Sequence, residues 1–366
     1  MKFVQTESTV ERGIIPPMNA KERREGRDSR PNVLVFITDQ HRYDHLGCNG
    51  NKIIRTPNID ALARTGMVFD RAYTANPLCM PARASLFTGR TPRGHGVRTN
   101  GIPLSPNVPT LPEALRQAGY RTHSAGKLHL HVYGIPEKDK NPRWENYPES
   151  VIAWKNRHHT ALPLPYFGFE SADFTAGHTH SVYGHYSQWL EDHHPGMLER
   201  MFPKNAKIKS EAPDTWVMDI PEALHHSSWI ADRAIDFLEE AGPAAVRGDR
   251  PFFLWCSFPD PHVPFAAPLP WGQMYDPAEM PEPNRTPGEL DRLPPFYKEI
   301  YEHGRWVSGL TQSGKHWAPW IREIQAMTYG MISLVDHHIG RVMRKLEALG
   351  LRENTLVVFM SDHGEM

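Results

Sequence analysis

The sequence is poor in cysteine, in net charge and in long apolar runs. Its 366 residues include three cysteines, Cys48, Cys79 and Cys256, which excludes a disulfide framework. The net charge of −1 gives no electrostatic reason to expect nucleic acid or an anionic membrane as a partner. No stretch has the apolar length of a signal peptide or of a membrane-spanning helix. We therefore expect a cytoplasmic protein, with export by another route left open.

Proline and histidine are the abundant residue types. The 34 prolines are scattered among aromatic-rich segments, which indicates long ordered loops, and the 21 histidines raise the odds of metal or acid–base chemistry. Residues 1–31 are polar and charged and are expected to form an N-terminal tail. Residues 32–366 are expected to fold around a large core.

Apolar patterns predict the regular elements. Three compact apolar runs, at 32–40, 251–258 and 355–363, are typical of buried parallel strands. Helical spacing or helix end signals are present at 56–66, 79–89, 110–120, 225–242 and 335–349. The alternation predicts an α/β fold, with a doubly wound, mostly parallel central sheet and helices on both faces. The proline-rich regions 131–220 and 259–320 are expected to form long loops with short elements on the substrate side.

Each predicted strand runs into residues that can bind a metal or move a proton. These pairs are Asp39 with Gln40, Asp260 with His262, and Asp362 with His363. Because the carboxyl ends of parallel strands meet at one edge of a sheet, we expect these side chains to form one site. Carboxylate and amide oxygens suit Ca²⁺ or Mg²⁺, whereas the nitrogen of His363 is more typical of Mn²⁺, Zn²⁺ or Fe²⁺.

Cys79 lies at the predicted start of a helix, in the stretch PLCMPARASLFTGR (77–90). Pro81 suits the first helical turn, and Gly89 is a stop signal. The N–H groups and the dipole of a helix N-terminus favour an anion, so a bound anionic ester and a thiolate fit this position equally well.

The run Cys79-Met80-Pro81-Ala82-Arg83, within LCMPARASLFTGR, resembles the modification signature of type I sulfatases, which belong to the alkaline-phosphatase-like superfamily. In that family the cysteine is oxidised to formylglycine, whose hydrate is the nucleophile. Ala82 stands where the family often has serine. Five more stretches resemble family motifs in the same order: NVLVFITDQHRYDHLG, TPNIDALARTGMVFDRAY, AGYRTHSAGKLHL, FPDPHVPF and VVFMSDHGEM.

The resemblance extends from about residue 32 to residue 366 and implies a sulfatase catalytic domain. The family's downstream lysine and small C-terminal domain have no counterpart, so we interpret the chain as truncated at its C-terminus and expect weak or no activity from it.

The resemblance also implies a metal site. Asp39, Gln40, Asp362 and His363 would hold one divalent ion together with the group made from Cys79. Ca²⁺ is the expected ion, with Mn²⁺ or Mg²⁺ as alternatives.

The catalytic roles implied by the resemblance fall on residues near Cys79. Arg83 would hold the hydrate, Lys127 would neutralise ester oxygens, and His129 would take a proton when the aldehyde re-forms. His262 would contact the leaving group and, if protonated, supply its proton. Lys127 and His129 alternate on a segment expected to be extended, so they would face the same way. The predicted substrate-binding residues are Asn100, Lys127 and His262.

These roles imply a sulfuric ester hydrolase acting on a small-molecule or carbohydrate sulfate ester, with a formylglycine-generating enzyme as its maturation partner. Gln40 and His363 resemble the variant found in phosphonate monoester hydrolases and in some sulfatases of the superfamily, so a phosphonate monoester or phosphodiester hydrolase is an alternative. A third reading is an inactive truncated fragment. The oligomeric state stays open.

Two groups of side chains have weaker expectations. Aromatic residues of the middle region could stack on a sugar or aryl ring, or fill the core: Trp154, Tyr166, Phe167, Tyr183, Tyr186 and Trp189. Four histidines are expected on helix surfaces: His225, His226, His337 and His338.

Overall fold

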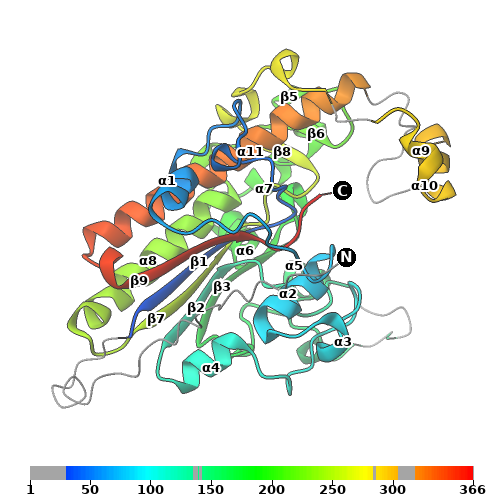
Figure 1. Cartoon of the computed structure of the whole chain (residues 1–366). Helices are drawn as coiled ribbons and strands as arrows, with labels where there is room; N and C mark the ends of the chain where they lie inside the picture. The colour runs from blue at the N-terminus through cyan, green and yellow to red at the C-terminus, as the bar shows by residue number, and fades with distance from the viewer. Residues whose placement is uncertain (1–29, 135–138, 140–141, 283–285, 304–317, 366) are drawn as a thin grey trace, which may run out of the picture.

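The computed structural model describes residues 30–134, 139, 142–282, 286–303 and 318–365 (Figure 1). Most of the predicted tail, residues 1–29, and part of the proline-rich region before 320 lie outside these ranges. Among the helices within these ranges, none has both the length and the apolar character that crossing a bilayer requires.

The central sheet has six strands in the order β4-β3-β2-β7-β1-β9. Neighbouring strands are parallel except for β4, which is antiparallel to β3. The strands are β1 (Asn32–Thr38), β2 (Arg121–Gly126), β3 (Ser171–Ala176), β4 (Tyr183–Gly184), β7 (Phe252–Ser257) and β9 (Thr355–Ser361). The three strands predicted from apolar runs are β1, β7 and β9, and they lie side by side. The predicted mostly parallel sheet is confirmed.

Both faces of the sheet are covered by helices, because its central strands are apolar on both sides. In β1, Leu34 and Phe36 pack in one core with helix α8, whereas Val35 and Ile37 pack in a second core with helix α2. Figure 1 shows α1, α8 and α11 over one face, and α2 and α4 over the other. The doubly wound arrangement is therefore confirmed.

The predicted helices are present, and α1, α2 and α4 largely follow the predicted boundaries, whereas α11 begins at Ala318, well before the predicted start at 335. They are α1 (Pro57–Thr65), α2 (Cys79–Thr88), α4 (Leu111–Gln117), α8 (His226–Arg247) and α11 (Ala318–Ala348). Helix α2 ends at Gly89, whose φ of 64° is the left-handed conformation that glycine adopts at helix ends. Helix α8 continues beyond the predicted end at 242 and contains Pro243.

The middle of the chain is more regular than predicted. Residues 131–220 contain α5 (Val151–Lys155), β3, β4, α6 (His185–His193), α7 (Met197–Arg200), β5 (Ile208–Lys209) and β6 (Thr215–Met218). A second sheet has the order β5-β6-β8, where β8 is Phe265–Pro268. The remaining α-helices are α3 (Pro92–His95), α9 (Glu289–Arg292) and α10 (Pro295–His303). Strand β3 was not predicted because its sequence, SADFTA, has no apolar run.

The expectation that four histidines lie on helix surfaces is wrong for three of them. His225, His226 and His338 are buried, and only His337 is half-exposed. The cause is the packing of α11 on α8, where the His338 Nε2 atom lies 3.0 Å from the Ser228 hydroxyl.

Most of the aromatic residues considered as a stacking platform fill the core instead. Trp154, Tyr166, Tyr183 and Tyr186 are buried. Trp189 is half-buried and lines a cavity of about 380 Å³ that shares no residue with the site described below.

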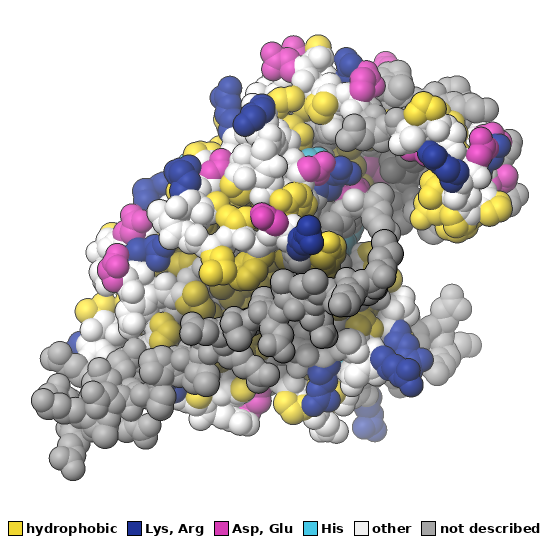
Figure 2. All heavy atoms as spheres, in the orientation of Figure 1, with side chains coloured by type: hydrophobic (Ala, Val, Ile, Leu, Met, Phe, Trp, Pro, Cys, Tyr) yellow, Lys and Arg dark blue, Asp and Glu magenta, His cyan; other side chains and the backbone are white. Residues whose placement is uncertain are grey.

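The visible surface carries charges of both signs. Figure 2 shows Lys and Arg side chains interspersed with Asp and Glu over the upper part of this face. This mixture agrees with the near-zero net charge of the sequence.

Candidate active site

The loops that follow β1, β7 and β9 meet at the carboxyl edge of the central sheet. The main-chain N–H of Asp39 donates to the Asp260 carbonyl at 3.1 Å, and that of Asp362 donates to the Thr38 carbonyl at 3.1 Å. These bonds continue the parallel ladder past the strand ends, so the polar residues predicted to share one edge do so.

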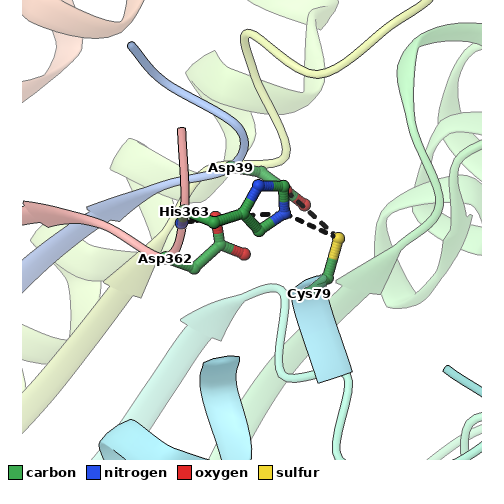
Figure 3. A group of neighbouring side chains, drawn as sticks. All are labelled: Asp39, Cys79, Asp362 and His363. Carbon is green, nitrogen blue, oxygen red and sulfur yellow. Dashed lines mark hydrogen bonds and ion pairs between the residues drawn. The ribbon is translucent and has the colours of Figure 1, made fainter. Parts of the chain in front are cut away.

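Four side chains converge beside the N-terminus of α2: Asp39, Cys79, Asp362 and His363 (Figure 3). The Cys79 Sγ atom lies 3.5 Å from Asp39 Oδ1 and 3.2 Å from His363 Nε2. His363 Nε2 is also 3.6 Å from Asp39 Oδ1 and 3.8 Å from Asp362 Oδ1. All four residues are buried. The structure thus brings together four of the five predicted metal ligands.

Gln40, the fifth predicted ligand, lies next to this cluster. Its main-chain N–H donates to Asp362 Oδ1 at 3.1 Å, and its side-chain amide donates to Glu365 at 3.1 Å. Glu365 was not predicted from the sequence. It orients the amide of Gln40 from a position three residues beyond Asp362.

Cys79 is held as a neutral thiol in these surroundings. Burial and the nearby Asp39 carboxylate raise the pKa of the Cys79 thiol. The thiolate that the helix N-terminus alone would favour is therefore not the stable form here.

Two buried cations face the carboxylates. Arg83, one helical turn after Cys79, donates from Nε to Asp362 Oδ2 at 2.8 Å and from Nη1 to the Lys127 main-chain carbonyl at 3.0 Å. The Lys127 ammonium donates to Asp39 Oδ2. Burial alone would raise the pKa of Asp39, but Lys127, with His178, His262 and Arg83, holds it well below its ordinary value.

His178, which was not predicted, is part of this cluster. Its Nε2 atom lies 2.7 Å from Lys127 Nζ and 3.4 Å from Asp39 Oδ2. Its ring stacks on His262, with centroids 3.5 Å apart and an interplanar angle of 5°. His178 follows β3. Because that strand was not predicted from the sequence, nothing indicated that His178 lies at the edge of the sheet.

His262 and His129 are neutral in this environment. Burial lowers the pKa of His262, and burial together with Lys127 and Arg83 lowers the pKa of His129 well below its ordinary value. A neutral His129 can accept a proton. The expectation that a protonated His262 supplies the leaving-group proton is not favoured by this shift.

One predicted placement needs correction, and a second predicted residue, Asn100, has a structural contact while its substrate role stays a prediction. Lys127 and His129 do not alternate on an extended strand, because β2 ends at Gly126 and His129 has a φ of 57°. Asn100, predicted to bind substrate, is exposed and its Oδ1 accepts the main-chain N–H of Met80 at 3.1 Å. Asn100 therefore stabilises the first turn of α2, since the first N–H groups of a helix have no partner within it.

Comparison with known proteins gives consistent results. A family model described as "Sulfatase" matches residues 31–366. An arylsulfatase of Clostridium perfringens is 30% identical over 346 residues, covering 92% of this chain and 63% of its own. A multifunctional alkaline phosphatase superfamily protein, PehA of Trinickia caryophylli, is 29% identical over 348 residues, with coverage of 92% and 63%.

A solved structure with the same fold is the phosphonate monoester hydrolase of Agrobacterium radiobacter. It superposes with a TM-score of 0.71 at 27% identity and covers 92% of this chain and 63% of its own. The chain thus spans a little under two thirds of the length of these relatives.

Proposed function

The chain belongs to the sulfatase family, and we propose that it hydrolyses an organic sulfate ester with one divalent metal ion and a formylglycine made from Cys79. The convergence of Asp39, Cys79, Asp362 and His363 beside two buried cations carries this proposal. An anionic ester is attacked most readily where a metal ion and fixed cations spread its charge.

The side chains around Cys79 fit a divalent ion. Ligand atoms about 2.4 Å from an ion and at right angles to each other lie about 3.4 Å apart. The distances among the Asp39, Cys79 and His363 donor atoms are 3.2–3.6 Å. The carboxylates of Asp39 and Asp362, with the amide of Gln40, favour Ca²⁺, whereas the nitrogen of His363 favours Mn²⁺. We propose Ca²⁺, with Mn²⁺ as the competing ion.

The metal would polarise the ester oxygens, and the formylglycine hydrate would supply the nucleophile that a buried neutral thiol does not. Arg83 is positioned to hold the group made from Cys79, since it lies one turn further along α2, on the same side of the helix. Lys127 faces the same space and would neutralise charge on the transferring group. His129, being neutral, would accept the proton whose loss releases the product.

A phosphonate monoester or phosphodiester hydrolase is the second candidate. The TM-score of 0.71 with a phosphonate monoester hydrolase and the presence of His363 in the metal cluster favour it. Two observations favour a sulfate ester as the substrate. The sequence GKLHL (126–130) resembles a sulfatase motif, and one relative is an arylsulfatase. An aryl or carbohydrate sulfate is the proposed substrate class.

Two measurements test the proposal. The chain is co-expressed with a formylglycine-generating enzyme, and mass spectrometry of the tryptic peptide containing Cys79 is expected to show the aldehyde. Rates on p-nitrophenyl sulfate and on a phenyl phosphonate ester are then compared, with Cys79→Ala as the control. Preference for the phosphonate ester would select the second candidate. Unmodified Cys79 without turnover of either ester would favour the inactive fragment.

A further inference from the structure

The segment that carries Lys127 and His129 has little regular structure to hold it. β2 ends at Gly126, which has a φ of 106°, and the Lys127 N–H donates to the Ser257 carbonyl at 3.1 Å. A Cβ at position 126 would collide with the same carbonyl, so only glycine fits this turn. Lys127 lies just beyond the end of β2, and His129 has a φ of 57°. A non-glycine residue in this conformation needs support from its surroundings.

Glu149 provides that support from just before helix α5. Its side chain is fully buried, and its Oε1 atom accepts the main-chain N–H groups of Leu130 at 2.9 Å and His131 at 3.1 Å. The same oxygen accepts the Tyr166 hydroxyl at 2.8 Å. One carboxylate thus binds two consecutive N–H groups directly after His129. Bonds of this kind to an ionised acceptor are about twice as strong as bonds between neutral groups.

Aromatic side chains also contact the same segment. The His129 ring stacks on Tyr133, with centroids 3.8 Å apart and an interplanar angle of 13°. Tyr133 meets Tyr183 edge-on, and the Tyr183 hydroxyl donates to the main-chain carbonyl of Glu149 at 2.9 Å. Stacking on Tyr133 therefore holds the ring of His129, and the bonds to Glu149 hold the backbone that follows it.

We propose that Glu149 is a positioning residue for the reaction, and that its carboxylate sets the conformation of residues 127–131 so that Lys127 and His129 face the substrate. This inference rests on the proposed function. Glu149 itself touches neither the cluster around Cys79 nor a reacting atom. It acts through the two N–H groups next to His129.

The charge of Glu149 makes its role testable by pH. Burial raises the pKa of Glu149 to about 7, although the bonds from Tyr166, Leu130 and His131 oppose this. The titratable groups facing it are the hydroxyls of Tyr133 and Tyr166, with Tyr183, His129 and His131 close by. The tyrosine pKa values are raised, so these hydroxyls stay neutral near pH 7. Ionisation above pH 7 strengthens the acceptor that holds the segment.

The raised pKa of Glu149 affects the stability of the folded state in the opposite direction from the strength of its hydrogen bonds. Because the folded pKa lies above the ordinary value of a glutamate, the folded state binds the proton between about pH 4.5 and 7, and stability from this group falls as pH rises through that range. Glu149→Gln cannot ionise. At pH 8 this substitution therefore removes a buried charge and weakens the hydrogen bonds that Glu149 accepts from Leu130 and His131.

The experiment compares Glu149→Gln with the wild type and with Glu145→Gln, the same change at an exposed position four residues earlier. At pH 8 we expect Glu149→Gln to lower kcat about tenfold with KM within twofold, while its Tm equals or exceeds that of the wild type. The ratio of wild-type to variant kcat should approach one at pH 6. A kcat loss that is equal at both pH values and follows a lower Tm would overturn the inference.

A measurement independent of activity separates this inference from the proposed function. Amide hydrogen exchange of peptides covering residues 127–133 is expected to be at least fivefold faster in Glu149→Gln than in the wild type at pH 8, and unchanged in Glu145→Gln. Equal exchange in all three proteins would refute the positioning role. An inactive wild type with faster exchange in Glu149→Gln would refute the proposed function and keep the role of Glu149 in shaping the segment.

Discussion

At the scale of single residues, Asp39 divides the site into two sides. Its Oδ1 atom faces Cys79 and His363, while its Oδ2 atom faces Lys127 and His178. One carboxylate thus contacts the proposed metal ligands with one oxygen and the proton-carrying groups with the other. Substitution of Asp39 would remove the contacts on both sides, so an Asp39 variant cannot show what each side contributes. His178 can, because it lies on one side only.

Replacement of His178 by alanine is predicted to lower kcat/KM about tenfold to hundredfold. Burial and Lys127 lower the pKa of His178 well below its ordinary value, so its ring is neutral and Nε2 can accept a hydrogen bond from Lys127. Loss of a hydrogen bond to a charged group costs about 1.5–3 kcal/mol, which corresponds to this range. Steady-state kinetics of His178→Ala and His178→Gln test the prediction.

His178→Gln keeps an acceptor and should recover part of the rate. His158→Ala is the matched control, because His158 is exposed and packs on Trp144. A rate for His178→Ala equal to that of His158→Ala would show that orientation of Lys127 does not depend on His178.

At the scale of elements, the start of α8 braces the loop after β7. His226, the first residue of α8, places Nε2 at 3.1 Å from Asp260 Oδ1, and the Ser227 hydroxyl donates to Asp260 Oδ2 at 2.6 Å. The carbonyl of Asp260 in turn accepts the N–H of Asp39. A helix packed on one face of the sheet therefore fixes the loop that carries His262 and the loop that carries Asp39.

Replacement of His226 by asparagine is predicted to cost about 3 kcal/mol of unfolding free energy at pH 7, because it removes the partner of a buried charge. Burial would raise the pKa of Asp260, but His226, His225 and Ser227 together lower it to about 2. A lowered carboxyl pKa stabilises the folded state above the ordinary value near 3.8, and this stability is lost as pH falls toward 2. Urea unfolding at pH 7 and Tm between pH 2 and 6 measure both effects.

The acid unfolding midpoint of His226→Asn should therefore lie at higher pH than that of the wild type. The control is His193→Asn on α6, an exposed position whose change should leave both measurements unaltered. Identical urea midpoints and acid midpoints for His226→Asn and the wild type would contradict a bracing role for the pair.

At the scale of the whole molecule, the site gathers buried like charges from distant segments. Asp39 and Asp362 directly follow β1 and β9, neighbouring strands that are more than 300 residues apart in sequence. Burial and the Asp39 carboxylate raise the pKa of Asp362, although Arg83 and Lys127 oppose this, so the two carboxylates repel each other. A divalent ion bound between them would offset this repulsion and tie the two strand ends together.

Removal of the metal is therefore predicted to lower Tm. An ion present at a hundred times its Kd stabilises the folded state by about 2.7 kcal/mol. For a chain of this size that corresponds to a shift of several degrees. Calorimetry after dialysis against EDTA, followed by addition of Ca²⁺ or Mn²⁺, measures the shift and ranks the two ions. Asp362→Asn should abolish the response, and an equal response in that variant would place the ion elsewhere.

The sequence by itself determined the central strands, the doubly wound class and the chemical identity of most of the site. Apolar runs such as 32–40 and 355–363 predict central strands, because a strand that is buried on both faces needs apolar residues throughout. The order of the polar residues after these strands predicted a shared edge, because parallel strands present their carboxyl ends on one side.

Only the tertiary structure decided which histidines lie at the candidate site and which pack between helices. β3 has no apolar run, so nothing in its sequence indicated that His178 follows a strand of the central sheet. The burial of His225, His226 and His338 depends on the packing of α8 against α11 and the β7 loop. Contacts between segments distant in sequence set these environments, and a local pattern carries no information about which segment will cover it.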